Sequence, residues 1–214
     1  MLSSVTVSLS LDVYKRQGLD DTGRRCDNGH CRIYNIDLPD VIEMRDHVLP
    51  GGEREQNLAL DLKDPAWMKA IDTDPADGTI LLAAGVFYYF KTDEVKALIV
   101  GMARRFPEGR LVFDAAGRTA VRLMLKTWVK QAGIRNVGAY FSVRDAKRKM
   151  ESWSPLLAVS SRGYMLGYQT LRDPSVRPVH RLLAKIADGP MRLQIVRIDF
   201  KEKHCRQIGG EYAD

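Results

Sequence analysis

The sequence has few cysteines, no long apolar run and only a small excess of positive charge. Its 214 residues include three cysteines, Cys26, Cys31 and Cys205. An odd, low count in a chain of this length excludes a disulfide framework and fits a reducing compartment, so we expect a cytoplasmic protein. No apolar segment approaches the roughly 20 residues that span a bilayer, and we expect no membrane partner.

Metal and nucleic-acid sites are also poorly supported. Cys31 and Cys205 each follow a histidine, but neither pair has the C-x-x-C spacing of zinc modules, so we expect no metal centre. The net charge is +6, from 33 basic and 27 acidic residues. Lys147-Arg148-Lys149 is the one basic cluster, and such a cluster is typical of a solvated helix face rather than of a nucleic-acid surface. Nothing in the pattern indicates an oligomeric state.

The first 17 residues, MLSSVTVSLSLDVYKRQ, differ from the rest of the chain. Apolar and polar residues alternate between Val5 and Val13, which predicts a strand. The ending DVYKRQ resembles a translated remnant of a sequencing adapter. We therefore interpret residues 1–17 as a non-native or atypical segment, and residues 18–214 as a single domain that lacks its native N-terminal part. The alternative is a genuine but unusual first strand.

From Arg32 onward, strand-like and helix-like segments alternate along the chain. The predicted strands are Arg32–Ile36, Asn57–Leu60, Thr79–Ala83 and Arg110–Phe113. The predicted helices are Pro39–Val48, Trp67–Ala70, Thr92–Arg105 and Arg118–Ala132. This alternation predicts an α/β fold with a mostly parallel sheet and helices on both faces.

The last third of the chain has a different pattern. We expect a short strand at 138–143, a short helix within 145–153 and one or two strands within 155–168. A helix at 178–187 and a strand at 192–200 should follow. A helix between two late strands fits a sheet that closes with an antiparallel edge.

Polar residues and glycines stand just after the predicted strands, where an open parallel sheet binds its ligands. Asp37 follows the second strand and could accept hydrogen bonds from two vicinal hydroxyls of a ribose. It could also be the N-cap of the helix that starts near Pro39, and both roles could hold together. Asp61 could accept from an adenine amino group or, less readily than Asp64, cap the next helix.

The later strand ends carry other residue types. Gly85 allows the backbone to approach a ligand closely. Tyr88 and Tyr89 could line a substrate pocket, although paired aromatic residues near a strand end are more often part of a core. Asp114 follows the fifth strand. No histidine stands at a strand end, because His47 and His180 lie in predicted helices, so no general base is assigned.

Four segments resemble the leucine carboxyl methyltransferase superfamily, in its polyketide O-methyltransferase branch. They are YNIDLPDVIEMRDHVLP, LDLKDPAWM, DGTILLAAGVFYYF and RLVFDAAG, in this order along the chain. The resemblance implies a Rossmann-like class I methyltransferase fold that uses S-adenosyl-L-methionine, with an antiparallel last strand. It implies that Asp37 holds the ribose and that Asp61 lies near the adenine. We assign Gly18, Asp20, Asp37, Leu38, Asp61, Leu62 and Gly85 to cofactor binding, and Tyr89 and Asp114 to substrate positioning.

Two departures from the family pattern qualify the expected function. The glycine turn before Gly18 is replaced by Arg16-Gln17, and the Glu that precedes the fourth-strand glycine is Ala84. We expect an O-methyltransferase of a small polyketide or carboxylate-type acceptor whose cofactor binding and turnover are weak in the chain as written. The alternatives are a non-catalytic Rossmann-like fragment and a nicotinamide-dependent dehydrogenase, and the absence of G-x-G-x-x-G argues against the second.

Overall fold

The computed structural model describes residues 5–9, 21–72, 78–124, 141–165 and 173–202. Its strands are β1 (Val5–Leu9), β2 (Arg32–Asp37), β3 (Glu55–Ala59), β4 (Thr79–Ala83), β5 (Arg110–Ala115), β6 (Leu157–Gly163) and β7 (Gln194–Phe200). Its helices are α1 (Thr22–Arg25), α2 (Pro39–Val48), α3 (Trp67–Ala70), α4 (Thr92–Arg105), α5 (Arg118–Met124), α6 (Ala146–Glu151) and α7 (Pro178–Asp188).

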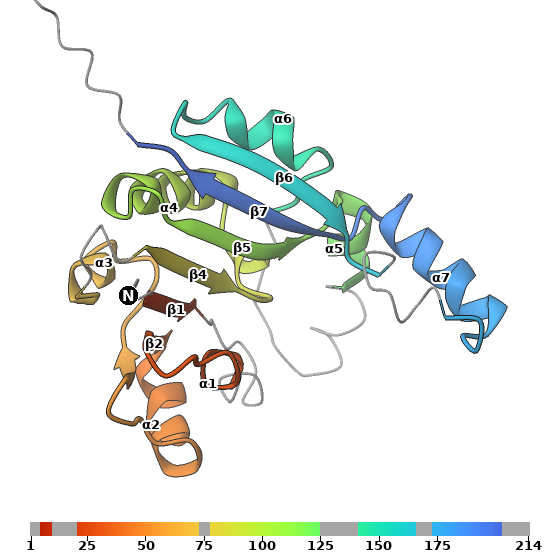
Figure 1. Cartoon of the computed structure of the whole chain (residues 1–214). Helices are drawn as coiled ribbons and strands as arrows, with labels where there is room; N and C mark the ends of the chain where they lie inside the picture. The colour runs from red at the N-terminus through yellow and green to blue at the C-terminus, as the bar shows by residue number, and fades with distance from the viewer. Residues whose placement is uncertain (1–4, 10–20, 73–77, 125–140, 166–172, 203–214) are drawn as a thin grey trace, which may run out of the picture.

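The strands form one seven-stranded sheet in the order β3-β2-β1-β4-β5-β7-β6 (Figure 1). The five strands from β3 to β5 pair in parallel. β7 runs antiparallel to both β5 and β6. The predicted α/β architecture, with a mostly parallel sheet and an antiparallel last strand, is confirmed.

The N-terminal strand β1 lies in the middle of the parallel part of the sheet. Val5–Leu9 pairs with Arg32–Ile36 of β2 on one side and with Thr79–Ala83 of β4 on the other. The strand predicted between Val5 and Val13 is therefore confirmed for its first five residues. The interpretation of residues 1–17 as non-native stays a prediction, but Val5–Leu9 completes the parallel sheet.

The two faces of the sheet are covered by different helices. On one face, α3, α4 and α6 contribute apolar side chains to a large core with the buried residues of β2, β4, β5, β6 and β7. On the other face, Ile33 and Asn35 of β2 lie beneath α1, where a Cβ at Gly23 would be 2.7 Å from Ile33 Cγ2. Arg45 of α2 donates to Asn57 of β3 on this same side. A sheet covered on both faces leaves its strand ends as the place for ligands.

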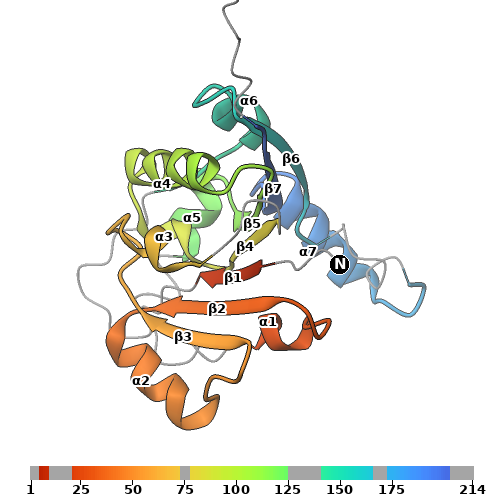
Figure 2. The same cartoon turned by 60° about the vertical axis from the view of Figure 1, so that its left-hand side comes forward.

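Figure 2 shows α7 extending away from the sheet. Its side chains Val179, Leu182 and Leu183 are exposed.

Among the described residues, none of the helices combines the length and the hydrophobicity that a membrane span requires.

Several predicted boundaries were exact and others were wrong. α2, α3, α4 and β4 begin and end where the sequence placed them. The short strand expected at 138–143 was wrong for its described part, because Phe141–Val143 has no strand pairing. β3 starts at Glu55 rather than Asn57, since its first two residues are polar and gave no strand pattern. α5 is described only to Met124, so the rest of the helix predicted to Ala132 lies outside the described residues.

Candidate functional site

The strand order contains one topological switch point. The chain proceeds from β1 outward to β2 and β3, then returns to β4 on the opposite side of β1 and continues to β5. Because these strands are parallel, their carboxyl ends share one edge, and the connections after β1 and β4 leave in opposite directions. In open α/β sheets a ligand binds outside the strand ends at such a point.

Asp37 ends β2 beside this switch point. Its side chain is 2% exposed, and its Oδ1 accepts a hydrogen bond from the Leu38 amide at 2.8 Å. Its carbonyl accepts from the Leu60 amide at 3.0 Å, which ties the ends of β2 and β3 together. The N-cap residue of α2 is Leu38, with Pro39 at the first helical position, so the alternative of Asp37 as the N-cap was wrong.

Asp61 lies just beyond β3 in an exposed turn. Its Oδ1 accepts from the Lys63 amide at 2.9 Å, and its carbonyl accepts from the Asp64 amide at 3.0 Å. Asp64 Oδ1 accepts from the Ala66 amide at 2.9 Å, but the N-cap residue of α3 is Ala66 itself, so the expectation that Asp64 or, less readily, Asp61 caps this helix was wrong. Asp61 therefore presents a solvated carboxylate at the same edge as Asp37.

Leu62 is placed differently from Asp61. Its side chain is 2% exposed and belongs to the main core. Leu38, by contrast, is half-buried. Gly18 and Asp20, assigned to the cofactor from sequence, lie outside the described residues.

On the other side of the switch point, Gly85 follows β4 and meets Asp114. This residue lies within β5, so its predicted place after the fifth strand was wrong. The Gly85 amide donates to Asp114 Oδ1 at 2.5 Å. Gly85 has a φ of 71°, a left-handed conformation that glycine adopts without a steric penalty. The loop after β4 is therefore fastened to the end of β5.

Tyr88 shares the Asp114 carboxylate. Burial raises the pKa of Tyr88 far above its ordinary value, and the charge of Asp114 and a hydrogen bond to it raise this pKa further. The phenol therefore stays protonated and donates to the carboxylate. Tyr88 packs with Ala116 and Val121, which confirms the core interpretation for this residue, while the neighbouring Tyr89 is half-buried.

A buried ionic cluster supports the β2–β3 side of the site. Glu55 accepts from Arg24 at 2.7 Å and from Asn35 at 2.8 Å, and its Oε1 lies 3.3 Å from Arg45 Nη2. Burial alone would raise the pKa of Glu55, but Arg24, Asn35 and Arg45 together lower it below its usual value. The cluster pins the β2–β3 register that sets Asp37 beside Ala59.

Only some of these contacts could be anticipated from sequence patterns. Asp114 and the aromatic pair were each noted as residues near strand ends. However, Gly85 and Asp114 are 29 positions apart, and no sequence pattern indicated that they meet. Glu55 was missed because a charged residue at the start of a strand looks like part of the preceding turn. The pairing of strands that are distant in sequence brings Asp114 to Gly85, and Glu55 to Arg24 and Arg45.

Comparison with known proteins gives these features a context. Residues 18–103 match the family model of leucine carboxyl methyltransferase. The S-adenosyl-L-methionine-dependent methyltransferase dpfgK of Gibberella zeae is 26% identical over 160 residues, which cover 70% of this chain and 53% of that protein. This chain therefore spans about half the length of the curated relative that it matches.

Solved structures of methyltransferases share the fold. An O-methyltransferase family protein from Burkholderia thailandensis superposes with a TM-score of 0.54 at 16% identity, over 92% of this chain and 51% of that chain. Geranyl diphosphate methyltransferase in complex with SAM gives a TM-score of 0.55 at 13% identity, over 92% of this chain and 78% of that chain. The fold is thus the Rossmann-like methyltransferase fold, as the resemblance of the four sequence segments implied.

Proposed function

We propose that this chain is an S-adenosyl-L-methionine-dependent methyltransferase that transfers a methyl group to an oxygen atom of a small molecule. The observation that carries the proposal is the switch point between β1 and β4, with the buried carboxylate of Asp37 on one side and the Gly85–Asp114 contact on the other. The family match and the curated relative support the cofactor, and the family's carboxyl acceptors support oxygen.

The residues present fit the cofactor's adenosine half. A carboxylate at the end of β2 can accept from both ribose hydroxyls, and Asp37 stands there. Asp61, exposed at the same edge, can accept from the adenine amino group. The left-handed Gly85 has no side chain to obstruct a ligand that lies against the end of β4. For the methionine half, we propose contacts with Gly18 and Asp20 in the segment that follows β1 in the sequence.

The protein's task in the reaction is mainly alignment. When bound, S-adenosylmethionine supplies a methyl group on a sulfonium, whose C–S bonding electrons stay on sulfur as the acceptor oxygen forms the new C–O bond. The chain must hold donor and acceptor in line and exclude water. Asp114 contributes by fixing the loop from Gly85 to Tyr89, which stands between the two sites that we propose.

A carboxylate acceptor suits this site better than a hydroxyl. A hydroxyl must lose a proton to a base, whereas an ionised carboxylate has none to lose. Within the described part of the chain, His30, His47 and His180 are exposed and stand away from the carboxyl ends of the strands. Tyr88 is held protonated by its burial and by Asp114, so it does not act as a base.

The decisive experiment is a calorimetric titration of the chain with S-adenosylmethionine and, separately, with NAD. We expect saturable binding of S-adenosylmethionine alone, with low affinity because Lys15-Arg16-Gln17 replaces the glycine turn of the family. Incubation with labelled cofactor and a panel of carboxylate and phenolic acceptors then tests turnover. Binding of NAD instead would refute the proposal, and cofactor binding without turnover on any acceptor would favour a non-catalytic fragment.

A further inference from the structure

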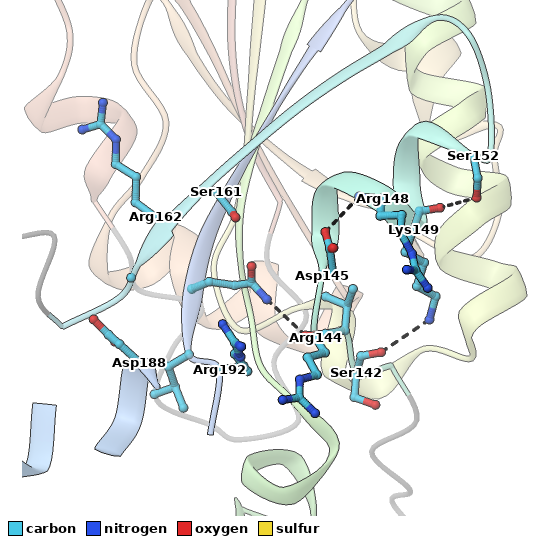
Figure 3. A pocket seen from close by; sticks show the side chains of 14 residues that line it. Ser142, Arg144, Asp145, Arg148, Lys149, Ser152, Ser161, Arg162, Asp188 and Arg192 are labelled. Carbon is cyan, nitrogen blue, oxygen red and sulfur yellow. Dashed lines mark hydrogen bonds between the residues drawn. The ribbon is translucent and has the colours of Figure 1, made fainter. Parts of the chain in front are cut away.

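A basic groove lies at the β6–β7 side of the sheet, next to the carboxyl end of β5. It has a volume of about 950 Å³, and one wall is the segment 142–152 while the other consists of the end of β6 and the segment 188–194 (Figure 3). Five basic side chains line it, namely Arg144, Arg148, Lys149, Arg162 and Arg192. Two acidic side chains line it as well, so positive charge dominates.

Both acidic side chains accept hydrogen bonds from backbone amides. Asp145 Oδ1 accepts from the backbone amide of Arg148 at 3.0 Å and caps α6. Asp188 Oδ1 accepts from the backbone amide of Met165 at 2.9 Å. Among the described residues, none of the four groove arginines forms an ion pair. Their guanidinium groups are left to face solvent or a ligand.

The position of Arg192 carries a conformational penalty. Its φ is 55°, in the left-handed region that long side chains rarely adopt. The turn is held from β5, because the Gly117 amide donates to the Met191 carbonyl at 2.9 Å. A Cβ at Gly117 would lie 2.9 Å from the Met191 carbonyl oxygen and 3.3 Å from Arg192 Cβ, so glycine is required there. Backbone strain of this kind is often found where a side chain has a function.

Lys149 adds a half-buried positive charge to the groove. Burial lowers the pKa of its ammonium group, and the nearby charge of Arg118 lowers it further, while Asp93 acts in the opposite direction. Its Nζ lies 3.5 Å from the Ser142 carbonyl. An anion in the groove would offset both the burial and the repulsion.

The groove is joined to the proposed methyl-transfer edge by direct contacts. The Val143 amide donates to the Ala116 carbonyl just after β5, and the Gln194 side chain donates to the Val143 carbonyl at 3.1 Å. Leu193, which lines the groove, packs against the apolar cluster of Tyr88. Since Tyr88 donates to Asp114, the groove adjoins the part of the site where we place the acceptor.

We propose that this groove binds an anionic group, a carboxylate or a phosphate, of the methyl acceptor. The assignment to an acceptor rests on the methyltransferase function proposed above. The groove residues lie between 142 and 194, outside the segment 18–103 that matches the family model, so they are a feature of this chain rather than of the matched segment. Arginine forks on opposite walls suit a planar carboxylate or a phosphate.

The test uses simple anions and the full chain. Citrate and inorganic pyrophosphate serve as carboxylate and phosphate probes in calorimetric titrations at low ionic strength, and the tighter probe identifies the chemical class. Arg192→Gly should weaken binding about tenfold, because it removes a charged donor. Glycine tolerates a φ of 55°, so this variant should melt no lower than the wild type. Arg144→Ala removes a basic side chain from the opposite wall, the segment 142–152, and should weaken anion binding as well.

Lys147→Ala is the matched control. Lys147 lies on α6 next to Arg148, carries the same charge and does not line the groove. Unchanged binding by this variant, beside the loss in Arg192→Gly and Arg144→Ala, supports the proposal. Equal weakening in all three variants, or no saturable binding of either probe by the wild type, overturns it.

A parallel titration with S-adenosylmethionine separates the two proposals. Cofactor binding without anion binding refutes the groove alone. Anion binding without cofactor binding refutes the methyltransferase function, and with it the assignment of the groove to a methyl acceptor.

Discussion

The Asp114 carboxylate accepts a hydrogen bond from the Gly85 amide at 2.5 Å, although the two residues are 29 positions apart in the chain. Asp114 also accepts from Tyr88, whose pKa is raised by burial and by this contact. One carboxylate therefore joins the end of β5 to the loop that follows β4. Both strand ends border the proposed methyl-transfer site, so the order of this loop depends on Asp114.

Replacing Asp114 by alanine should lower the free energy of unfolding by about 1–3 kcal/mol, because it leaves two buried or half-buried donors without their acceptor. Asp114→Asn should cost less, since the amide oxygen can still accept. Denaturant unfolding measures both costs, and hydrogen exchange of the Gly85 amide reports the loop directly. Equal protection of that amide in the wild type and in Asp114→Ala would contradict the assignment.

Asp37→Ala should weaken S-adenosylmethionine binding by about 1–3 kcal/mol, because the ribose hydroxyls lose their acceptor. Asp37→Glu should also weaken it, since a site that is 2% exposed has little room for a longer side chain. Asp40→Ala, an exposed residue in the first turn of α2, is the control and should bind normally. Calorimetric titration after a melting check is the measurement, and normal affinity in both Asp37 variants would remove the ribose assignment.

Val7→Pro should destabilise the protein by about 3 kcal/mol or more, because proline cannot donate to the ladder in a strand with neighbours on both sides. Val7 pairs with Tyr34 of β2 and Leu81 of β4. Val7→Thr keeps the backbone amide and β-branching and should cost much less. Deleting residues 1–17 should be at least as damaging as Val7→Pro. An equal melting temperature for the full chain and for the chain without residues 1–17 would show that β1 is not needed for stability.

Glu55→Gln should cost about 3 kcal/mol, because the buried carboxylate that accepts from Arg24 and Arg45 would lose its charge. The double variant Glu55→Gln with Arg45→Met should recover part of this loss, since a buried positive charge beside the neutral amide is then removed. Chemical denaturation of the wild type, the two single variants and the double variant gives the coupling free energy between Glu55 and Arg45. Simple additivity of the two single changes would mean that the pair does not interact.

The Asp27–Arg54 ion pair should stabilise the protein in a defined pH range. Hydrogen bonds from Arg54 and from the Gly29 amide lower the pKa of Asp27 from 3.8 to about 2. A carboxyl group with a depressed folded-state pKa contributes its full stability above the unfolded value, and loses it as the pH falls through the folded value.

The stability difference between the wild type and Asp27→Asn should therefore be constant above pH 4 and shrink between pH 4 and 2. Glu43→Gln, an exposed change on α2, serves as the control for the removal of one negative charge. Thermal melts across this pH range provide the measurement. A difference that stays constant down to pH 2 would show that the pair does not depress the pKa of Asp27.

Hydrophobic periodicity was enough to predict most helices and strands of the first 115 residues. Thr92–Arg105 places Val95, Leu98, Ile99 and Met102 on one face, and all four are buried in the structure as this spacing predicts. The run TILLA predicted β4 with its observed bounds, because a strand between two others is apolar on both faces. Asp37 was identified by a different argument. A carboxylate at a strand end costs free energy unless a hydrogen-bond donor of the protein or of a ligand meets it.

Which of these elements come into contact could not be predicted from such local patterns. Strand pairing between distant segments set β1 between β2 and β4, buried Glu55 between Arg24 and Arg45, and brought Asp114 to Gly85. The basic groove was equally invisible in the sequence, where Arg144 and Arg192 are separated by nearly fifty positions and look like ordinary surface residues. Periodicity reports what a segment does locally, whereas a site depends on contacts whose partners are fixed by the whole sheet.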